Sequence, residues 1–336
     1  MPSIGSIPTS AEMTASPLKI FSLDAGAPLA DAVAGELGIE RSAHEERDFA
    51  DGEHKLRPLD DVEAADVYVV QSLYGAAGSS VDDKLIRLLF FIATLRDVGA
   101  HRVTAVVPYL CYGRKDRRTK LRDPLSSRYL ASLFEAMGAD AVVTLDAHNQ
   151  AAFENAFRCR TLHLLAQPLL LDFAANRLRD ETRPLVVASP DVGGVKRAEA
   201  LRTAMGERLG REIGRAFVEK YRSGGQLSGG TLVGDVRDAA VLVVDDLISG
   251  GGTIERAVTA LRDAGAAKIL VTASHGQFSG DARERLSPLS IDAIAVTDSL
   301  PQPAPAGQIA VLSSAPLLAE AIRRLHGGGP ACELSL

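Results

Sequence analysis

Cysteine is scarce in this chain, which has three cysteines among 336 residues and no tryptophan. Cys111, Cys159 and Cys332 lie far apart in the sequence and lack the spacing of metal ligands. This distribution excludes a cysteine metal centre and is typical of reduced thiols inside a cell.

The chain also lacks long hydrophobic segments. Its longest apolar run, Leu88–Leu95, lies between two arginines and is too short to span a bilayer. The N-terminus has neither the basic start nor the apolar core of a signal peptide. We therefore expect a cytoplasmic protein with no membrane partner.

An excess of positive charge is missing as well. The formal net charge is −6 and the isoelectric point is near 5.7. With no basic tract and no aromatic-rich basic patch, these values argue against a nucleic-acid partner. The hydrophobic content of 46% with 24% charged residues is ordinary for a globular protein. A chain of 336 residues is too long for one typical core, so we expect two domains.

The most informative stretch is Val241–Thr253, VLVVDDLISGGGT. Its first four residues are apolar, which predicts a buried strand, Val241–Val244, that ends at Asp245 and Asp246. The small residues Ser249–Thr253 follow as a loop, and apolar residues at helical spacing come after them.

A small-residue loop at a helix N-terminus binds anions, because free N–H groups and the positive end of the helix dipole converge there. Two carboxylates beside such a loop can accept hydrogen bonds from the vicinal hydroxyls of a ribose. The glycines alone predict only a turn between a strand and a helix. With two acids fixed ahead of them, the pattern predicts a ribose-phosphate site made of Asp245, Asp246, Ser249, Gly250, Gly251, Gly252 and Thr253.

Short apolar strands alternate with helical segments along the whole chain, for example at Val103–Val107, Ala141–Leu145 and Ile269–Ala273. This alternation predicts an α/β fold of mainly parallel sheets flanked by helices, with functional loops at the carboxyl ends of the strands. No low-complexity linker separates the halves. The expected divisions are an N-terminal tail (residues 1–17), an N-terminal lobe (18–160), a C-terminal lobe (161–326) and a C-terminal tail (327–336).

Several polar stretches are ambiguous by themselves. The basic run in Pro108–Lys120, PYLCYGRKDRRTK, suits a solvated loop and a polyphosphate site equally well. Asp146-Ala147-His148 can hold a divalent ion, although a loop histidine more often only makes hydrogen bonds. Glu46–Glu53, ERDFADGE, predicts a surface turn around Asp51-Gly52. The four glycines of Ser223–Gly230 predict a flexible lid.

Together these stretches resemble the ribose-phosphate pyrophosphokinase family, the phosphoribosyl-diphosphate (PRPP) synthetases. The likeness covers nearly everything between the two tails. One such motif would be weak support for this family, whereas the ordered set is strong support. The resemblance implies two phosphoribosyltransferase-like lobes. The motifs occur in the family's order: FADGE, VVQS, PYLCYGRKDR, DAH, SPDVGGVKR, the Lys-x-Arg at Lys220 and Arg222, VVDDLISGGGT and SHGQFSG.

The resemblance implies transfer of diphosphate from ATP to the anomeric hydroxyl of ribose 5-phosphate, giving PRPP and AMP, with Mg²⁺ as cofactor. It implies a homo-oligomer whose ATP site is shared between subunits. By the same resemblance, Phe49, Asp51 and Glu53 form the loop that receives adenine, and this loop reaches in from a neighbouring subunit. The resemblance implies that Arg114, Lys115 and Asp116 contact ATP and that His148 and Asp191 are magnesium-linked. It also implies that Lys220 is the catalytic lysine with Arg222 as its partner, and that Asp245, Asp246 and Ser249–Thr253 bind ribose 5-phosphate.

Two departures from the family pattern stand out: Lys115 replaces the usual Gln, and Gly250 replaces the usual Thr. Two other functions remain open. A phosphoribosyltransferase would share the ribose-phosphate loop, but it usually has a single α/β domain and needs no adenine-binding half. A catalytically silent regulatory subunit would be expected to lose the lysine or the metal positions, and this chain keeps both.

Overall fold

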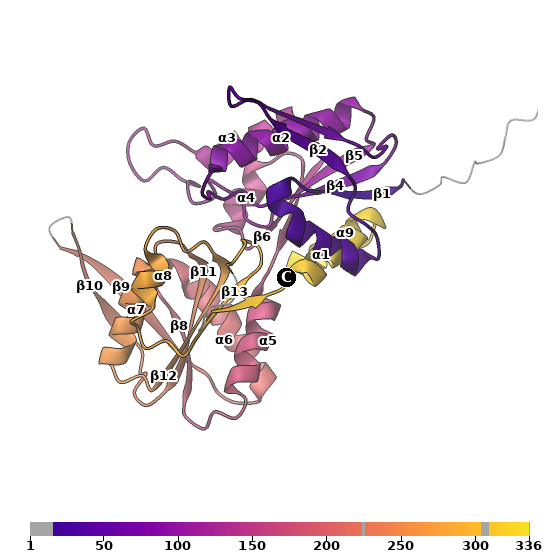
Figure 1. Cartoon of the computed structure of the whole chain (residues 1–336). Helices are drawn as coiled ribbons and strands as arrows, with labels where there is room; N and C mark the ends of the chain where they lie inside the picture. Colours follow the sequence, from indigo (N-terminus) through magenta and orange to yellow (C-terminus); the bar gives the residue numbers. More distant parts are fainter. Residues whose placement is uncertain (1–15, 224–225, 304–308, 336) are drawn as a thin grey trace, which may run out of the picture.

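The computed structural model describes residues 16–223, 226–303 and 309–335. The chain forms two α/β lobes, and its last helix returns to the N-terminal lobe (Figure 1). Each lobe contains a sheet of mainly parallel strands with helices on both faces, which confirms the predicted fold class.

The first sheet has five strands, all parallel. Its central strands are nearly continuous runs of apolar residues because they are buried on both faces. In spatial order the strands are β1 (Leu18–Phe21), β4 (Asp66–Val70), β5 (Arg102–Val106), β6 (Ala141–Leu145) and β7 (Arg160–Leu164).

The second sheet has seven strands, and only its edge strand β10 runs antiparallel to its neighbour. In spatial order the strands are β10 (Gln226–Val233), β9 (Gly214–Ser223), β8 (Leu185–Ser189), β11 (Ala240–Ile248), β12 (Lys268–Gly276), β13 (Ala293–Thr297) and β14 (Ile309–Leu312). A separate two-stranded hairpin pairs β2 (His44–Asp48) with β3 (His54–Pro58).

The helices form three layers around the two sheets. One hydrophobic core joins the inner faces of both sheets through a shared layer made of α1, α5, α6 and α9, while α2 to α4 and α7 to α8 cover the outer faces. Among the described helices, none is both long and apolar enough to cross a bilayer. The bounds are α1 (Ala27–Leu37), α2 (Val81–Asp97), α3 (Ser126–Ala136), α4 (Gln150–Ala156), α5 (Gln167–Leu178), α6 (Val195–Leu209), α7 (Gly252–Asp263), α8 (Ala282–Leu286) and α9 (Ala315–His326), with 3₁₀ turns η1 (Asp24–Gly26), η2 (Val192–Gly194) and η3 (Ala331–Ser335).

Three features of the structure cross the expected divisions of the chain. The first sheet extends to Leu164, beyond the expected boundary at residue 160, because β7 pairs with β6. Helix α9, assigned to the C-terminal lobe, packs against α1 of the N-terminal lobe. The end of the chain is docked as η3, with Ala331 in the shared core. Apolar spacing predicts that an element exists but does not specify its neighbour. Residues 1–15 of the expected N-terminal tail lie outside the described residues.

Helix α9 is fixed to the first sheet by a buried charge network. The Asp66 carboxylate on β4 accepts a hydrogen bond from Arg102 Nε at 2.7 Å and lies 2.7 Å from His326 Nδ1 at the end of α9. Arg102 Nη2 also donates to the Leu325 carbonyl at 3.0 Å. Burial raises the pKa of Asp66, but Arg102 and His326 outweigh it, so the pKa lies below its usual value.

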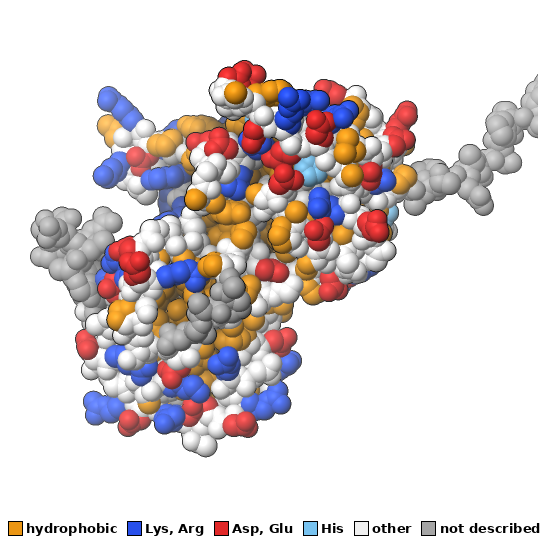
Figure 2. Space-filling model, in the orientation of Figure 1, with side chains coloured by type: hydrophobic (Ala, Val, Ile, Leu, Met, Phe, Trp, Pro, Cys, Tyr) orange, Lys and Arg blue, Asp and Glu red, His pale blue; other side chains and the backbone are white. Residues whose placement is uncertain are grey.

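On the face shown in Figure 2, acidic and basic side chains intermingle over both lobes, and neither sign forms a large patch. The predicted surface turn lies at the tip of the β2–β3 hairpin, where Phe49 N donates to the Glu53 carbonyl at 2.8 Å. The predicted lid, Ser223–Gly230, covers the end of β9 and the first five residues of β10. Residues 224 and 225 lie outside the described residues, and the flanking backbone forms paired strands.

Candidate functional site

A cleft lies between the two lobes, and its walls come from the carboxyl ends of the parallel strands. Asp146 and His148 follow β6, Asp191 follows β8, and Asp245 and Asp246 lie near the end of β11. This is the edge at which α/β proteins bind ligands. Strand β11 continues to Ile248, so the two acids lie within the strand, beyond the predicted end at Val244.

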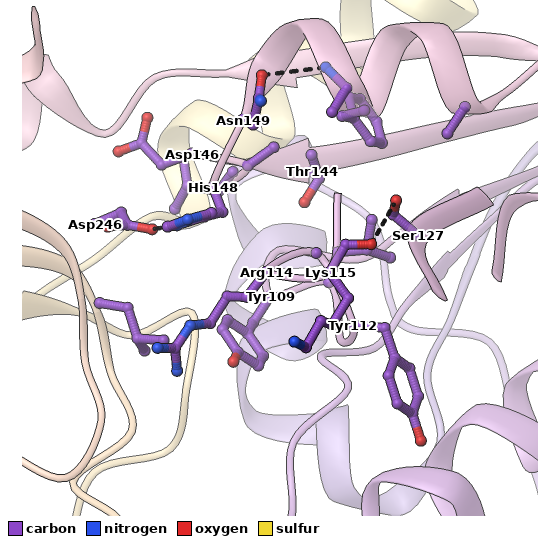
Figure 3. Close-up of a pocket in the computed structure, with 18 of the residues that line it drawn as sticks. Tyr109, Tyr112, Arg114, Lys115, Ser127, Thr144, Asp146, His148, Asn149 and Asp246 are labelled. Atoms are coloured by element: carbon purple, nitrogen blue, oxygen red, sulfur yellow. Dashed lines mark hydrogen bonds and ion pairs between the residues drawn. The ribbon is translucent and has the colours of Figure 1, made fainter. Parts of the chain in front are cut away.

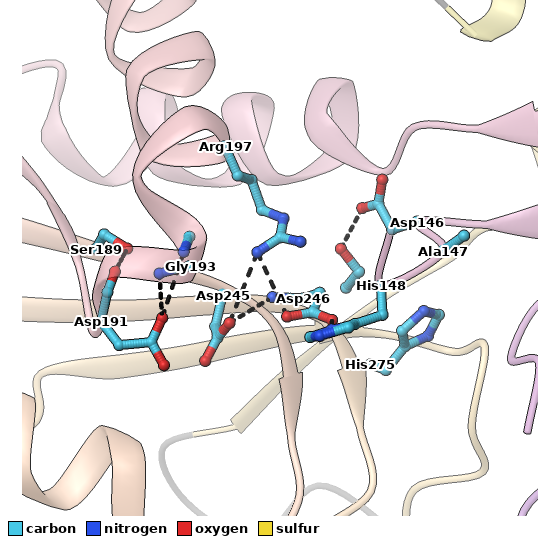
Figure 4. Close-up of polar contacts among 12 residues, drawn as sticks. Asp146, Ala147, His148, Ser189, Asp191, Gly193, Arg197, Asp245, Asp246 and His275 are labelled. Atoms are coloured by element: carbon cyan, nitrogen blue, oxygen red, sulfur yellow. Dashed lines mark hydrogen bonds and ion pairs between the residues drawn. The ribbon is translucent and has the colours of Figure 1, made fainter. Parts of the chain in front are cut away.

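Asp246 connects the two lobes at the centre of this cleft (Figure 4). His148 Nδ1 lies 2.7 Å from Asp246 Oδ2, although the two residues are 98 positions apart in the sequence. Arg197 Nη1 lies 3.4 Å from Asp246 Oδ1 and 3.6 Å from Asp245 Oδ1. The predicted ribose acids and one predicted metal position therefore form a single cluster with Arg197.

The contacts in this cluster shift the pKa values of Asp245 and Asp246 in opposite directions. Burial raises the pKa of Asp246, but His148 and Arg197 outweigh burial and hold it below its usual value. For Asp245, burial and the adjacent Asp246 charge raise the pKa. The hydrogen bond to Asp246 raises the pKa of His148, against the opposing effect of burial. The arrangement favours a charged His148–Asp246 pair.

The predicted phosphate loop, Ser249–Thr253, lies at the N-terminus of α7 and lines the cleft. Gly251 has a φ of 77°, which a side chain rarely adopts. Ser249 Oγ donates to Gln277 Oε1 at 2.9 Å and lies 3.1 Å from Ser279 Oγ, so the loop is tied to the segment after β12. At Gly250 an added Cβ would meet nothing within 4 Å, so the residue leaves open space where the family usually has Thr.

The two predicted magnesium positions lie in the same cleft but not beside each other. Asp191 and His148 flank the Asp245–Asp246 pair on opposite sides (Figure 4). Asp191 Oδ1 accepts hydrogen bonds from Gly193 N at 2.9 Å and Gly194 N at 3.3 Å, which fixes its carboxylate. The four aspartates that line the cleft, Asp146, Asp191, Asp245 and Asp246, form an oxygen-rich donor set, which suits Mg²⁺ held partly by substrate phosphates. The residues present therefore fit the implied cofactor.

Exposed cations line the N-terminal side of the cleft. Arg114, in the loop after β5, lines the cleft, and together with Lys115 it also lines an adjoining pocket (Figure 3). Tyr109, Phe153 and Phe157 line the same pocket. Within the described part of the chain, the side chains of Arg114 and Lys115 have no hydrogen-bond or ion-pair partner. Unpaired cations in a protein of net negative charge are available to an anionic ligand.

The predicted adenine residues lie elsewhere. Phe49, Asp51 and Glu53 form the tip of the β2–β3 hairpin and are absent from the walls of the cleft and of the pocket. Phe49 is 40% exposed, with the Arg47 guanidinium 5.2 Å from its ring centroid. Asp116 is also absent from these walls, but it accepts a hydrogen bond from Asn149 Nδ2 at 2.6 Å, and Asn149 lines the cleft.

The predicted catalytic residues Lys220 and Arg222 lie on β9, which is adjacent to β8 in the second sheet. Their backbones pair with Gly230 and Leu227 of β10. Their side chains lie outside the described part of the structure.

Sequence reasoning missed two functional candidates in the cleft, Arg197 and His163, and it considered Asp146 only together with His148. Arg197 lies in the SPDVGGVKR stretch but was given no role, although a cation after Asp191 was a visible signal. Asp146 has a φ of 39° and accepts from Ala166 N at 3.3 Å and from Ser274 Oγ of the other lobe. His163 Nε2 accepts from Ala147 N at 3.0 Å, which positions the turn before His148. Its place inside strand β7 gave no signal.

Comparison with known proteins gives a consistent result. Residues 18–138 match the family model described as the N-terminal domain of ribose phosphate pyrophosphokinase, and residues 226–334 match the phosphoribosyl synthetase-associated domain. A ribose-phosphate pyrophosphokinase from Hyphomonas neptunium is 36% identical over 92% of this chain and 96% of its own length. One from Bifidobacterium longum is 37% identical over 91% and 88%. The crystal structure of phosphoribosylpyrophosphate synthetase from Mycobacterium smegmatis superposes with a TM-score of 0.85 at 35% identity, covering 94% of this chain and 100% of that one.

Proposed function

The chain belongs to the ribose-phosphate pyrophosphokinase family, and we propose that it transfers the diphosphate of ATP to the anomeric hydroxyl of ribose 5-phosphate. The products are PRPP and AMP. The observation that best supports this assignment is the His148–Asp246 contact, because it brings the basic ATP-side loop and the ribose-phosphate loop to one cleft.

The ribose-phosphate half of the site acts by positioning. The N-terminus of α7 receives the 5-phosphate through backbone N–H groups of Ser249–Thr253. Asp245 and Asp246 accept hydrogen bonds from the ribose hydroxyls, and Arg197 holds both carboxylates in place. A sugar fixed in this way presents its anomeric hydroxyl in line with the β-phosphorus of ATP, which removes much of the entropic cost of the reaction.

The remaining side chains stabilise charge. Lys220, Arg222 and Arg114 neutralise the phosphoryl oxygens and the departing AMP, where negative charge is greatest in the transition state. Magnesium at Asp191, and at His148 in its neutral form, would supply Lewis-acid charge neutralisation at the phosphates. No covalent enzyme intermediate is needed, since the sugar hydroxyl is itself the nucleophile.

We also propose that the ATP site is completed by a second copy of the chain. Phe49, Asp51 and Glu53 lie on an exposed hairpin tip rather than in the walls of the cleft. A stacking platform placed in this way can serve the cleft of a neighbouring subunit in a homo-oligomer.

The direct test is AMP formation from ATP and ribose 5-phosphate with Mg²⁺ and without any nucleobase. We expect equimolar PRPP and AMP, detected by ion-exchange chromatography. A phosphoribosyltransferase would make no AMP under these conditions, and a silent regulatory subunit would also be inactive. Adding a nucleobase and PRPP separates these two outcomes, because only a phosphoribosyltransferase then forms a nucleotide. Other pentose phosphates, tested in parallel, define the sugar preference.

A further inference from the structure

Three side chains from separate segments converge at the edge of the N-terminal lobe, away from the cleft. Asp24 lies in η1, directly after β1, while His44 and Glu46 lie on the same face of β2. One ligand atom from each residue falls within 4.8 Å of the other two. The Asp24 backbone N–H donates to Glu46 Oε2 at 3.0 Å, which fixes the two segments to each other.

The histidine nitrogen at the centre of this cluster lacks a hydrogen-bond partner within the described chain. His44 Nε2 is inaccessible to solvent, and the side chain as a whole is 4% exposed. Nε2 lies 3.6 Å from Asp24 Oδ1 and 3.6 Å from Glu46 Oε2, too far for a hydrogen bond to either. The ring packs against Phe91, with centroids 5.8 Å apart. A buried polar atom aimed at two carboxylates and bonded to neither requires an explanation.

A metal ion explains this spacing better than a direct contact does. Ligand atoms about 2.0–2.1 Å from a tetrahedral ion lie roughly 3.3–3.4 Å apart. The two His44 distances of 3.6 Å need to shorten by only a few tenths of an ångström to reach this geometry, and the ligand atoms of Asp24 and Glu46 lie within 4.8 Å of each other. One imidazole nitrogen with two carboxylate oxygens is a donor set that suits Zn²⁺ and related transition metals better than Mg²⁺.

The charges at the cluster also favour a cation. The carboxylates of Asp24 and Glu46 bring two negative charges to the His44 imidazole. Arg87 Nη1 lies 2.9 Å from the other carboxylate oxygen of Glu46, Oε1, so it leaves Oε2 facing His44. The Asp24 side chain is 78% exposed, which leaves a path by which an ion and its water ligands can enter.

We propose that Asp24, His44 and Glu46 form a structural site for a divalent transition-metal ion, with Zn²⁺ as its best match. The ion would connect η1 to the base of the β2–β3 hairpin, so it would stiffen the hairpin that carries Phe49, Asp51 and Glu53. The site is separate from the cleft, and the proposal does not depend on the reaction assigned above.

The test is Zn²⁺ binding by the full-length protein, measured by isothermal titration calorimetry and by thermal unfolding. Excess Mg²⁺ is included to compete for the oxygen ligands of the cleft. Asp24→Asn is the main variant, because an exposed side chain can change without unfolding the chain, and His44→Gln is the second. His101→Gln is the matched control, since His101 is exposed and belongs to no such cluster among the described residues.

We expect wild type and His101→Gln each to bind one Zn²⁺ ion. Asp24→Asn and His44→Gln should bind it at least about 10- to 100-fold more weakly, because loss of even a residue that only hydrogen-bonds to a ligand lowers metal affinity by that factor. Zn²⁺ should raise the unfolding temperature of wild type and of the control, but not of His44→Gln. Equal Zn²⁺ affinity in wild type and Asp24→Asn would overturn the proposal. If neither variant loses a Zn²⁺ site that wild type has, the proposal is wrong and His44 only pairs with the two acids.

Discussion

The Ser249–Thr253 loop and the Phe49–Glu53 turn differ in what surrounds them. The loop lies at the N-terminus of α7, lines the cleft and is tied to Gln277 and Ser279. The turn ends a two-stranded hairpin whose strands pair only with each other, and its Phe49 ring is 40% exposed. One chain therefore assembles the proposed ribose-phosphate half of the site, while the proposed adenine half lies on an exposed turn.

The two halves of the proposed site should therefore respond differently to mutation and to the oligomeric state of the protein. Mutations around the Ser249–Thr253 loop should affect only the subunit that carries them, and diluting the protein should not change their effect on activity. Changes at the turn should act on the neighbouring subunit and should depend on the oligomer. The following experiments test this distinction.

The largest effect is expected from Lys220→Ala, within the C-terminal half. Removing a preorganised cation that meets transition-state charge typically lowers turnover on the order of 100- to 1,000-fold. We expect kcat to fall on that order while both KM values change much less, because ground-state binding uses the group less. Steady-state AMP release measures both constants.

Lys268→Ala is the matched control for this variant, because Lys268 pairs with Glu181 at the opposite, amino end of β12. Its kinetic constants should remain those of wild type. Near wild-type turnover in Lys220→Ala would refute the catalytic assignment. Lys220→Arg should restore only part of the rate, because the planar guanidinium of arginine does not reproduce the compact ammonium group of lysine.

A smaller and more selective effect is expected from the acid pair. Asp246→Asn removes the charge that contacts both His148 and Arg197. Asp245 contacts Arg197 but not His148. Hydrogen bonds to charged groups contribute about 1.5–3 kcal/mol, so the KM for ribose 5-phosphate should rise roughly 10- to 100-fold in Asp246→Asn. Asp245→Asn should raise it less. Equal increases in the KM values for ATP and ribose 5-phosphate would exclude the ribose assignment.

Phe49→Ala tests the exposed half. Loss of a stacking platform is worth about 1 kcal/mol, so the KM for ATP should rise roughly fivefold with little change for ribose 5-phosphate. Leu59→Ala, an exposed apolar residue just beyond β3, is the control and should leave both values unchanged. Mixed oligomers of Phe49→Ala and Lys220→Ala should contain hybrid sites with both residues intact, so part of the activity should recover the wild-type KM for ATP. No recovery after verified subunit exchange would place adenine within one chain, with the pocket beside Tyr109 as its candidate position.

Lys115→Gln should have the smallest effect. The substitution restores the residue usual in the family, and Arg114 beside it still supplies positive charge to the same pocket. We expect less than a threefold change in the KM for ATP. Lys120→Gln, on the same loop but outside the pocket walls, is the control. Complete inactivity of Lys115→Gln would mean that Lys115 has an essential catalytic role in this chain.

Much of this fold could be predicted from local pattern. The alternation of apolar strands and helices predicted the two parallel sheets, and β6 has the predicted bounds. The acids, glycines and helix of Val241–Thr253 predicted one wall of the cleft, because all of them are consecutive in the sequence.

Contacts between distant segments could not be predicted in this way. Periodicity did not indicate that β7 joins the first sheet, or that α9 returns to the N-terminal lobe. The His148–Asp246 contact joins residues from different lobes, and neither has a local pattern that names the other. The Asp24, His44 and Glu46 cluster escaped notice for the same reason, since Asp24 lies far from the other two in sequence.

The helical layer shared by the two sheets has a consequence for how the protein unfolds. Ala30 of α1, Leu170 of α5 and Leu318 of α9 belong to one continuous core that covers the inner faces of both sheets. Neither lobe can separate from the other without exposing that core to water, so the cost of opening is close to the cost of unfolding. The two lobes should therefore melt in a single cooperative transition, and substrates should enter by movement of loops rather than by rotation of one lobe against the other.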